Sequence, residues 1–193
     1  MHRGLLLFGY PGSGKGTQGR ILSALPGFHH VAMGDIFRSL SPANPLYDRV
    51  MSTIRRGDLV PDELAMDLFF GYVASLQPKA DDFLVIDGVP RNARQVELLN
   101  QKVQVIKIFK LSIYDERVVI DRLRRRAQEQ GRTDDASDEL IQHRLDVYRH
   151  ETESCIKAYA GPLLTRIQAN QPIFDVHLDI IQALGKMRNI HFP

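Results

Sequence analysis

The sequence predicts an α/β fold in which helices flank a central parallel sheet of five strands. Two observations carry this prediction. Short apolar runs typical of buried strands alternate with segments of helical periodicity. The first apolar run also leads directly into a glycine-rich loop and then a helix-compatible stretch. The predicted strands are Leu5–Phe8, Phe28–Ala32, Phe83–Ile86, Val103–Leu111 and Pro172–Val176. Ligands of such sheets bind at the carboxyl ends of the strands, so we expect the functional loops to meet there.

Composition is that of an ordinary globular protein of one domain. The 193 residues are 44% hydrophobic and 25% charged, with a formal net charge of +2. This small charge gives no reason to expect a nucleic-acid partner, and no apolar stretch approaches the roughly 20 residues of a membrane span. The N-terminus enters the first strand at once, so we expect no signal peptide. We interpret the single cysteine, Cys155, as a helix packing residue. A cytoplasmic monomer is the expectation.

The loop that follows the first predicted strand is the strongest functional signal. Gly9-Tyr-Pro-Gly-Ser-Gly-Lys-Gly-Thr17 holds four glycines and one lysine. Glycines let backbone N–H groups turn towards a phosphate, and the N-terminus of the next helix adds partial positive charge. Lys15 can reach the β- and γ-phosphates of a nucleotide. Gly16 stands where the general pattern has Ser or Thr, which argues against a typical GTPase or motor ATPase.

Two segments interrupt the alternation of strands and helices. The segment from Met33 to about Gln77 is predicted to form consecutive helices without a strand, with a helix stop at Gly57 and a helix start at Pro61-Asp-Glu63. The other interruption is short and polar and lies between two helical stretches. We interpret residues 33–62 as a substrate-binding helical insertion and residues 124–137 as a short mobile lid. Both belong to a single domain, 1–193.

Further motifs occur in a fixed order along the chain. An acid ends a predicted strand in Asp87-Gly-Val-Pro-Arg91, and the others are His30-Val-Ala-Met-Gly-Asp-Ile-Phe-Arg38, Gly57-Asp-Leu-Val-Pro-Asp-Glu63 and Gly131-Arg-Thr-Asp-Asp135. An arginine-rich helix precedes the last of these, and His143-Arg-Leu-Asp-Val-Tyr148 follows it. From Gly4 to about Tyr159 the chain resembles the adenylate kinase family. The resemblance implies a P-loop kinase core with a helical monophosphate-binding insertion and a short lid. It also implies reversible phosphoryl transfer from ATP to a nucleoside monophosphate, with ATP + AMP ⇌ 2 ADP as the expected reaction.

The resemblance also implies roles for individual residues. The catalytic groups that it implies are Lys15, Arg91, Arg122, Arg126, Arg132 and Arg144. The ATP site is expected to comprise Gly12, Ser13, Gly14, Lys15, Gly16, Thr17, Arg122 and Arg126. The monophosphate site is expected to comprise Met33, Arg38, Asp58, Leu59, Val60, Gly88, Val89, Pro90, Arg91, Gln95, Arg132 and Arg144. Asp87 is expected to hold Mg²⁺ through water.

The lid of this chain is short. Only five residues separate Arg126 from Arg132, which leaves no room for the small β-subdomain of long-lid relatives. We therefore expect no structural zinc. Asp134 and Asp135 are expected to belong to the closing lid. The arginines suit their task because a guanidinium is always charged and can bind phosphate through two parallel hydrogen bonds.

The sequence leaves open which base the acceptor nucleotide carries. Gln95 matches the glutamine that reads adenine in adenylate kinases, and an amide offers both a donor and an acceptor. Met33 instead stands where the family has threonine, so UMP, CMP or another monophosphate remains an alternative acceptor. A non-catalytic nucleotide-binding protein is a second alternative, but the P-loop lysine and phosphate-facing arginines are all present. A nucleic-acid role rests only on the arginine run Arg122–Arg126.

Overall fold

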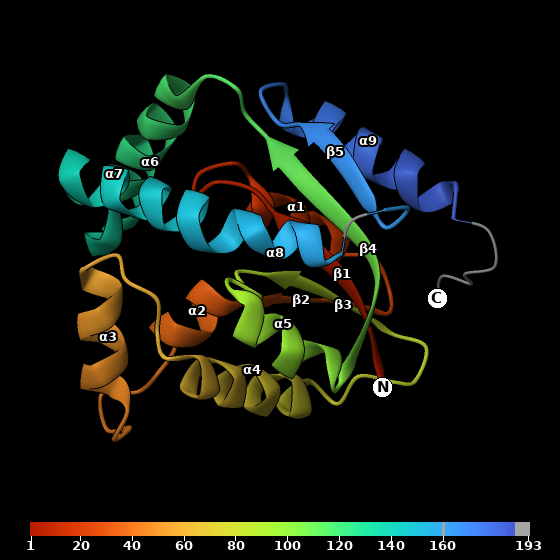
Figure 1. Cartoon of the computed structure of the whole chain (residues 1–193), viewed down its shortest axis with the longest axis horizontal. Helices are drawn as coiled ribbons and strands as arrows, with labels where there is room; N and C mark the ends of the chain where they lie inside the picture. Colours follow the sequence, from red (N-terminus) through yellow and green to blue (C-terminus); the bar gives the residue numbers. More distant parts are fainter. Residues whose placement is uncertain (160, 188–193) are drawn as a thin grey trace.

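Five parallel strands form one sheet in the order β2-β3-β1-β4-β5 (Figure 1). The structure is a computed structural model that describes residues 1–159 and 161–187. The central strand β1 pairs with β3 on one side and with β4 on the other, and the fold is α/β as predicted. The strands are β1 His2–Phe8, β2 Phe28–Ala32, β3 Phe83–Asp87, β4 Val103–Ser112 and β5 Leu164–Gln168.

Helices cover both faces of the sheet, and each face has its own core. Because side chains alternate along a strand, Leu5 and Leu7 of β1 pack into one core while Leu6 and Phe8 pack into the other. The core around Leu6 is shared with α2 Met33–Arg38, α3 Tyr47–Arg55, α4 Asp62–Leu76, α5 Ala93–Asn100 and α8 Glu153–Ala158. The core around Leu5 is shared with α1 Lys15–Leu22, α6 Glu116–Gln130, α7 Asp138–Val147 and α9 Ile173–Gly185.

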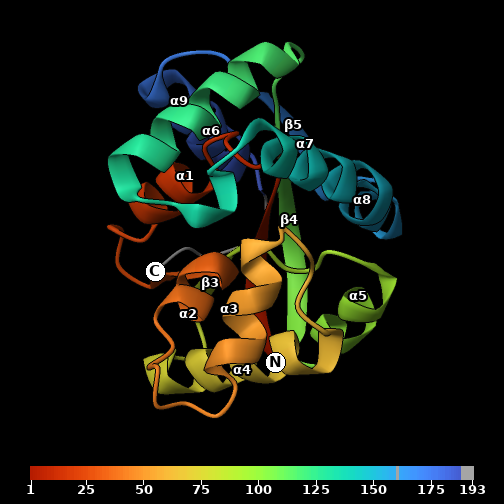
Figure 2. The ribbon, with the colours of Figure 1, turned by 90° about the vertical axis from the view of Figure 1, so that its left-hand side faces the viewer.

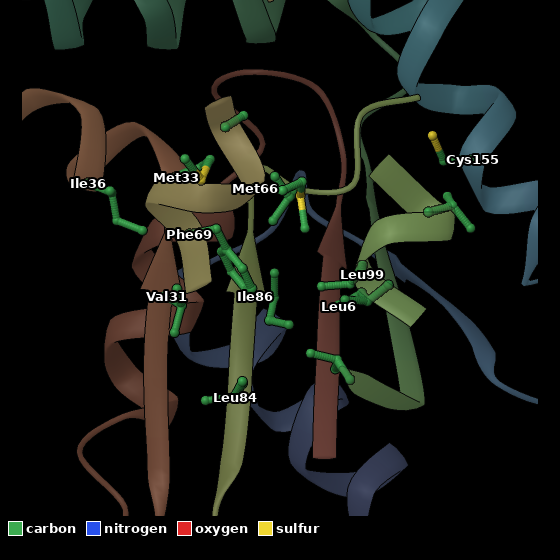
Figure 3. Packing of buried hydrophobic residues seen from close by; sticks show 14 of the residues in the cluster. Leu6, Val31, Met33, Ile36, Met66, Phe69, Leu84, Ile86, Leu99 and Cys155 are labelled. Carbon is green, nitrogen blue, oxygen red and sulfur yellow. The ribbon is translucent and has the colours of Figure 1, made fainter. Parts of the chain in front are cut away.

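The core around Leu6 joins the helices on this face to the sheet. Figure 3 shows Phe69 of α4 against Ile86 of β3, and Leu99 of α5 beside Leu6. Cys155 is buried at the edge of this cluster on α8, which confirms its interpretation as a packing residue. Burial raises the pKa of its thiol to about 11, so the group stays protonated at neutral pH.

The last strand lies earlier in the chain than predicted. The sequence pattern predicted this strand at Pro172–Val176, and the prediction was wrong. β5 is Leu164–Gln168, and Pro172 is the N-cap residue of α9. Within the described sheet β5 is an edge strand that pairs with β4, and Ile167 is its buried residue. An edge strand needs no continuous apolar run, and Leu164–Gln168 has none, so the signal that located the inner strands β1, β3 and β4 is missing here. The other four strand predictions are confirmed.

The segment between β2 and β3 is helical, as predicted. Residues 33–77 contain α2, α3 and α4 and no strand. Gly57 ends the turn after α3 with a φ of 78°, a left-handed conformation that favours glycine, and Pro61 precedes α4. The polar segment near residue 130 is partly helical, because α6 runs to Gln130 before η1, a 3₁₀ turn at Thr133–Asp135. No helix within residues 1–159 and 161–187 is long and apolar enough to cross a membrane.

Candidate active site

A cleft of about 440 Å³ opens at the carboxyl ends of β1, β2 and β3. Loops from distant parts of the chain form its walls, as expected for the strand ends of a parallel sheet. The structure brings every predicted site residue to this cleft. They are Gly12, Ser13, Gly14, Lys15, Gly16, Thr17, Met33, Arg38, Asp58, Leu59, Val60, Asp87, Gly88, Val89, Pro90, Arg91, Gln95, Arg122, Arg126, Arg132 and Arg144.

The glycine-rich loop wraps around the amino group of Lys15. Gly12 and Gly14 have φ values of 82° and 99°, which turn the backbone sharply before α1 begins at Lys15. The Nζ of Lys15 donates to the carbonyl oxygens of Gly9 at 2.8 Å and of Tyr10 at 2.9 Å. Burial lowers the pKa of Lys15 to about 8, against the opposing effect of the Asp87 carboxylate. The loop thus holds a partly desolvated ammonium group at the helix N-terminus.

Asp87 and Arg91 stand at the two ends of the turn that follows β3. Asp87 is the last residue of β3, and its Oδ2 is 3.7 Å from where a Cβ on Gly16 would lie. The Nε of Arg91 donates to the carbonyl oxygen of Gly88 at 3.0 Å, and burial lowers the pKa of its guanidinium. The Val89–Pro90 peptide bond is cis. A carboxylate in this position beside a glycine-rich loop is of the kind that fits Mg²⁺, which binds phosphate and carboxylate oxygens and retains waters.

Two aspartates of η1 form ion pairs with three arginines on the α6–α7 side of the cleft. Asp135 is fully buried and accepts from the Nε of Arg126 at 2.9 Å and from the Nη1 of Arg144. Asp134 pairs with Arg144 at 2.8 Å and with Arg132 at 4.0 Å. Buried charges are costly unless they are paired, so these carboxylates hold the guanidiniums in place. The sequence motif identified the residues but not their pairing.

One wall of the cleft is formed by α2 and by the turn after β3. Arg38 donates to Oδ1 of Asp35, one helical turn earlier, at 2.7 Å. Met33 is buried, and its Cβ is 3.1 Å from where a Cβ on Gly88 would lie. Figure 3 places Met33 at the end of the core nearest Met66. Met33 thus forms an apolar wall and offers no hydroxyl at this point of the cleft.

The helical insertion touches helix α7 directly. Asp58 accepts from Nε of Arg56 at 2.9 Å and lies 2.9 Å from Nε2 of His143. These two hydrogen bonds lower the pKa of the Asp58 carboxyl, with His143 the larger cause. Figure 2 shows α3 reaching up towards the α6–α7 segment at this point. Sequence reasoning placed Asp58 in the site but did not foresee this contact.

Sequence reasoning missed two groups of cleft residues. One comes from the loop between β5 and α9 and from the first turn of α9, and comprises Ala169, Gln171, Ile173 and Val176. The Nη1 of Arg122 donates to the carbonyl oxygen of Ala169 at 3.1 Å. This loop therefore contacts Arg122 through its backbone, and a backbone contact leaves no side-chain motif in the sequence. The other group is Tyr148 and Thr152, which lie on a π-helical turn. The buried hydroxyl of Thr152 has no hydrogen-bond partner within residues 1–159 and 161–187. Tyr148 ends a motif already visible in the sequence, which could have signalled it.

Comparison with known proteins agrees with this architecture. A family model described as adenylate kinase matches residues 7–162. The chain is 36% identical over 192 residues to an adenylate kinase of Micrococcus luteus, covering 96% of this chain and 92% of that protein. It is 37% identical over 187 residues to one of Thermobifida fusca (93% and 97% covered) and 36% identical to one of Synechococcus sp. (93% and 94%). Together with the cleft, these matches establish that the chain belongs to the adenylate kinase family.

Proposed function

We propose that this protein is an adenylate kinase that catalyses ATP + AMP ⇌ 2 ADP in the cleft at the strand ends. Family membership and the curated relatives favour this reaction over the other monophosphate kinases. The observation that carries it is the gathering of Lys15 and the six predicted arginines in one cleft: Arg38, Arg91, Arg122, Arg126, Arg132 and Arg144. An oxygen of the AMP phosphate attacks the γ-phosphorus of ATP, and the bond from that phosphorus to the β,γ-bridging oxygen breaks. The enzyme positions the two nucleotides and stabilises the charge that develops.

The donor half of the cleft is proposed to hold ATP. The backbone N–H groups of residues 12–17 surround its β-phosphate, and Lys15 exchanges two carbonyl partners for phosphate oxygens. Arg122 lies beside Ala169, where it covers the base. Asp87 faces the same loop and is proposed to hold Mg²⁺ through water. The ion, when bound, shields the negative charge of the phosphates and helps to orient them.

The acceptor half is proposed to hold AMP between the insertion, residues 33–62, and the turn after β3. Arg38 and Arg91, which both border the cleft, bind the phosphate of AMP. The backbone of Leu59 and Val60 lines the base pocket, with Met33 packing against the base. Gln95 reads the edge of adenine through its amide. Asp58 closes this half through its contact with His143.

Residues 124–137 are proposed to act as a short lid. When the nucleotides bind, Arg126, Arg132 and Arg144 exchange the carboxylates of Asp134 and Asp135 for phosphate oxygens. Arginine suits this exchange because its planar fork binds carboxylate and phosphate with the same geometry. Closure also excludes water, which otherwise competes with AMP as the phosphoryl acceptor.

We also propose that the enzyme works as a cytoplasmic monomer on free nucleotides, without nucleic-acid or membrane partners. Its one cysteine is buried with a raised pKa, as suits a protein that needs no disulfide. Size-exclusion chromatography with light scattering tests the oligomeric state. A mass near twice 21.9 kDa would contradict the monomer.

The proposed function is tested by measuring diphosphate formation from MgATP with AMP, GMP, CMP, UMP or dTMP as acceptor. We expect strong preference for AMP, and a loss of turnover by orders of magnitude in Lys15→Ala. Preference for CMP or UMP would keep the phosphoryl transfer and change the acceptor. No transfer to any acceptor would refute the proposal, as would near-normal turnover of Lys15→Ala.

A further inference from the structure

The side-chain amide of Gln95 is held at both ends by other residues. Its Oε1 accepts from the backbone N–H of Arg91 at 2.8 Å, and its Nε2 donates to Oδ1 of Asp62 at 2.8 Å. The residue is only 2% exposed, yet it borders the cleft. An amide has two N–H donors and two acceptor lone pairs. One N–H and one lone pair of Gln95 therefore have no partner among the hydrogen bonds of residues 1–159 and 161–187.

The two partners of Gln95 fix which way its amide points. A backbone N–H can only donate, and an ionised carboxylate can only accept. An inverted amide would set Nε2 against the N–H of Arg91 and Oε1 against the carboxylate of Asp62. Both contacts would be repulsive, so the observed orientation is strongly preferred.

Asp62 is itself held in place by a second amide. Its Oδ1 also accepts from Nδ2 of Asn92 at 2.8 Å. The Oδ1 of Asn92 accepts from the backbone N–H of Gln95 at 2.9 Å, which caps α5. The direction of every hydrogen bond in this group is thus determined by a backbone N–H or a carboxylate.

Orientation matters because bases differ in the order of donors and acceptors on their pairing edges. Adenine presents an amino donor beside a ring-nitrogen acceptor, and cytosine has the same order. Guanine and uracil present a carbonyl acceptor beside a ring N–H donor, which is the reverse. A glutamine amide can pair with two adjacent groups at once, so inverting the amide exchanges the preferred class of base.

We propose that Asp62 is a positioning residue that determines acceptor-base specificity by fixing the orientation of the Gln95 amide. This inference rests on the proposed function, in which Gln95 faces the base of AMP. Asp62 is the first residue of α4 and does not itself line the cleft, so it acts through Gln95. It lies at the end of residues 33–62, where the insertion rejoins the core.

The informative variant is Asp62→Asn. An asparagine amide can turn either an oxygen or a nitrogen towards Gln95, whereas a carboxylate can only accept. The variant therefore keeps the side-chain size but removes the carboxylate's part in fixing the amide, so that only the backbone N–H of Arg91 still favours the observed orientation. Glu63→Gln is the matched control. It removes the same charge from the next residue in the first turn of α4, but Glu63 binds Arg94 at 3.2 Å instead of Gln95.

The experiment compares kcat/KM for AMP and GMP at saturating MgATP. In Asp62→Asn we expect the kcat/KM for AMP, divided by that for GMP, to fall by about ten-fold. This is the effect of one misdirected hydrogen bond. The fall should come from the KM values, with kcat for AMP within about two-fold of the parent and the KM for ATP unchanged. Glu63→Gln should leave the ratio as it is. Equal ratios in the two variants, or a loss confined to kcat, would overturn the proposal.

A double-mutant cycle tests whether the effect passes through Gln95. In a Gln95→Ala background, Asp62→Asn should no longer change the ratio, because the amide that it orients is gone. If Asp62→Asn lowers the ratio equally in both backgrounds, it acts through the packing of α4 and the proposal is wrong. If the parent enzyme forms no ADP from AMP, the proposed function itself fails, which is a different result.

Discussion

We expect the Lys15 ammonium group to make ATP binding depend on pH in a range where few other groups titrate. Its pKa is lowered to about 8 by burial, with the charges of Arg91, Arg126 and Arg144 adding to the effect and Asp87 opposing it. Bound phosphates add negative charge beside the amine and raise its pKa again. ATP therefore binds best to the protonated form, and its affinity falls as pH rises through 8.

The size of this effect follows from the lowered pKa. At pH 7 most of the free protein carries a charged Lys15, and at pH 9 about nine-tenths of it is neutral. The Kd for ATP should then rise about ten-fold between pH 7 and pH 9, equivalent to about 1.4 kcal/mol. The phosphates of ATP do not account for this change, because their last ionisation lies near pH 6.

Isothermal titration calorimetry at pH 7, 8 and 9 measures the Kd and the protons taken up on binding. Lys15→Arg and Lys15→Met should both give flat profiles, the first because arginine stays charged and the second because nothing titrates. Lys15→Met should also bind ATP weakly at every pH. A parent Kd that does not change between pH 7 and 9, or a slope that persists in Lys15→Met, would refute the reasoning.

Three further perturbations test other parts of the structure. Asp135→Ala leaves Arg126 and Arg144 without their shared carboxylate, so urea denaturation of the ligand-free protein should show a loss of about 3–5 kcal/mol. A loss below about 1 kcal/mol would mean that these pairs contribute little to stability. Met33→Thr should change acceptor preference more than ATP affinity, and an effect on ATP affinity alone would show that Met33 is outside the acceptor pocket. Phe69→Ala empties a fully buried position and should cost about 3–5 kcal/mol of unfolding free energy. The control Phe174→Ala, at a side chain 72% exposed, should cost less than about 0.5 kcal/mol, and equal costs would contradict the assigned core.

Two of the strands that the sequence predicted lie in the middle of the sheet and share one physical property. β1 and β3 are buried on both faces, and apolar runs such as Leu5–Phe8 follow directly from that burial. β5 owes its place to backbone pairing with β4, in a register that joins Ile108 to Leu164. Backbone pairing leaves little trace in side-chain identity, so Leu164–Gln168 did not stand out in the sequence.

The site could be predicted as a set of residues but not as a set of contacts. Glycine and proline motifs dictate local backbone shape, so the loop at residues 9–17 and the turn at residues 87–91 were recognisable. Pairs such as Asp62 with Gln95, and Asp58 with His143, join residues 33 and 85 positions apart. Such contacts depend on how α3, α4, α5 and α7 pack, which no local pattern encodes.

The loop between β5 and α9, together with the first turn of α9, shows a different limit of sequence reasoning. Ala169 takes part through its carbonyl oxygen, and Ile173 and Val176 border the cleft as apolar side chains. These residue types occur throughout any protein and carry no chemical signal of their own. They reach the cleft because of where β5 lies in the sheet, and β5 is the strand whose position was predicted wrongly from the sequence.

The aspartates of η1 also make the cleft selective among the anions of the surrounding solution. Because Asp134 and Asp135 are attached to the chain, their effective concentration beside the arginines is at least in the millimolar range. Chloride or a single free phosphate must compete with these tethered groups for Arg126 and Arg144. A pair of nucleotides brings several linked phosphates at once and has a multivalent advantage. The carboxylates that pair with these arginines should thus make them available mainly to ligands of high charge.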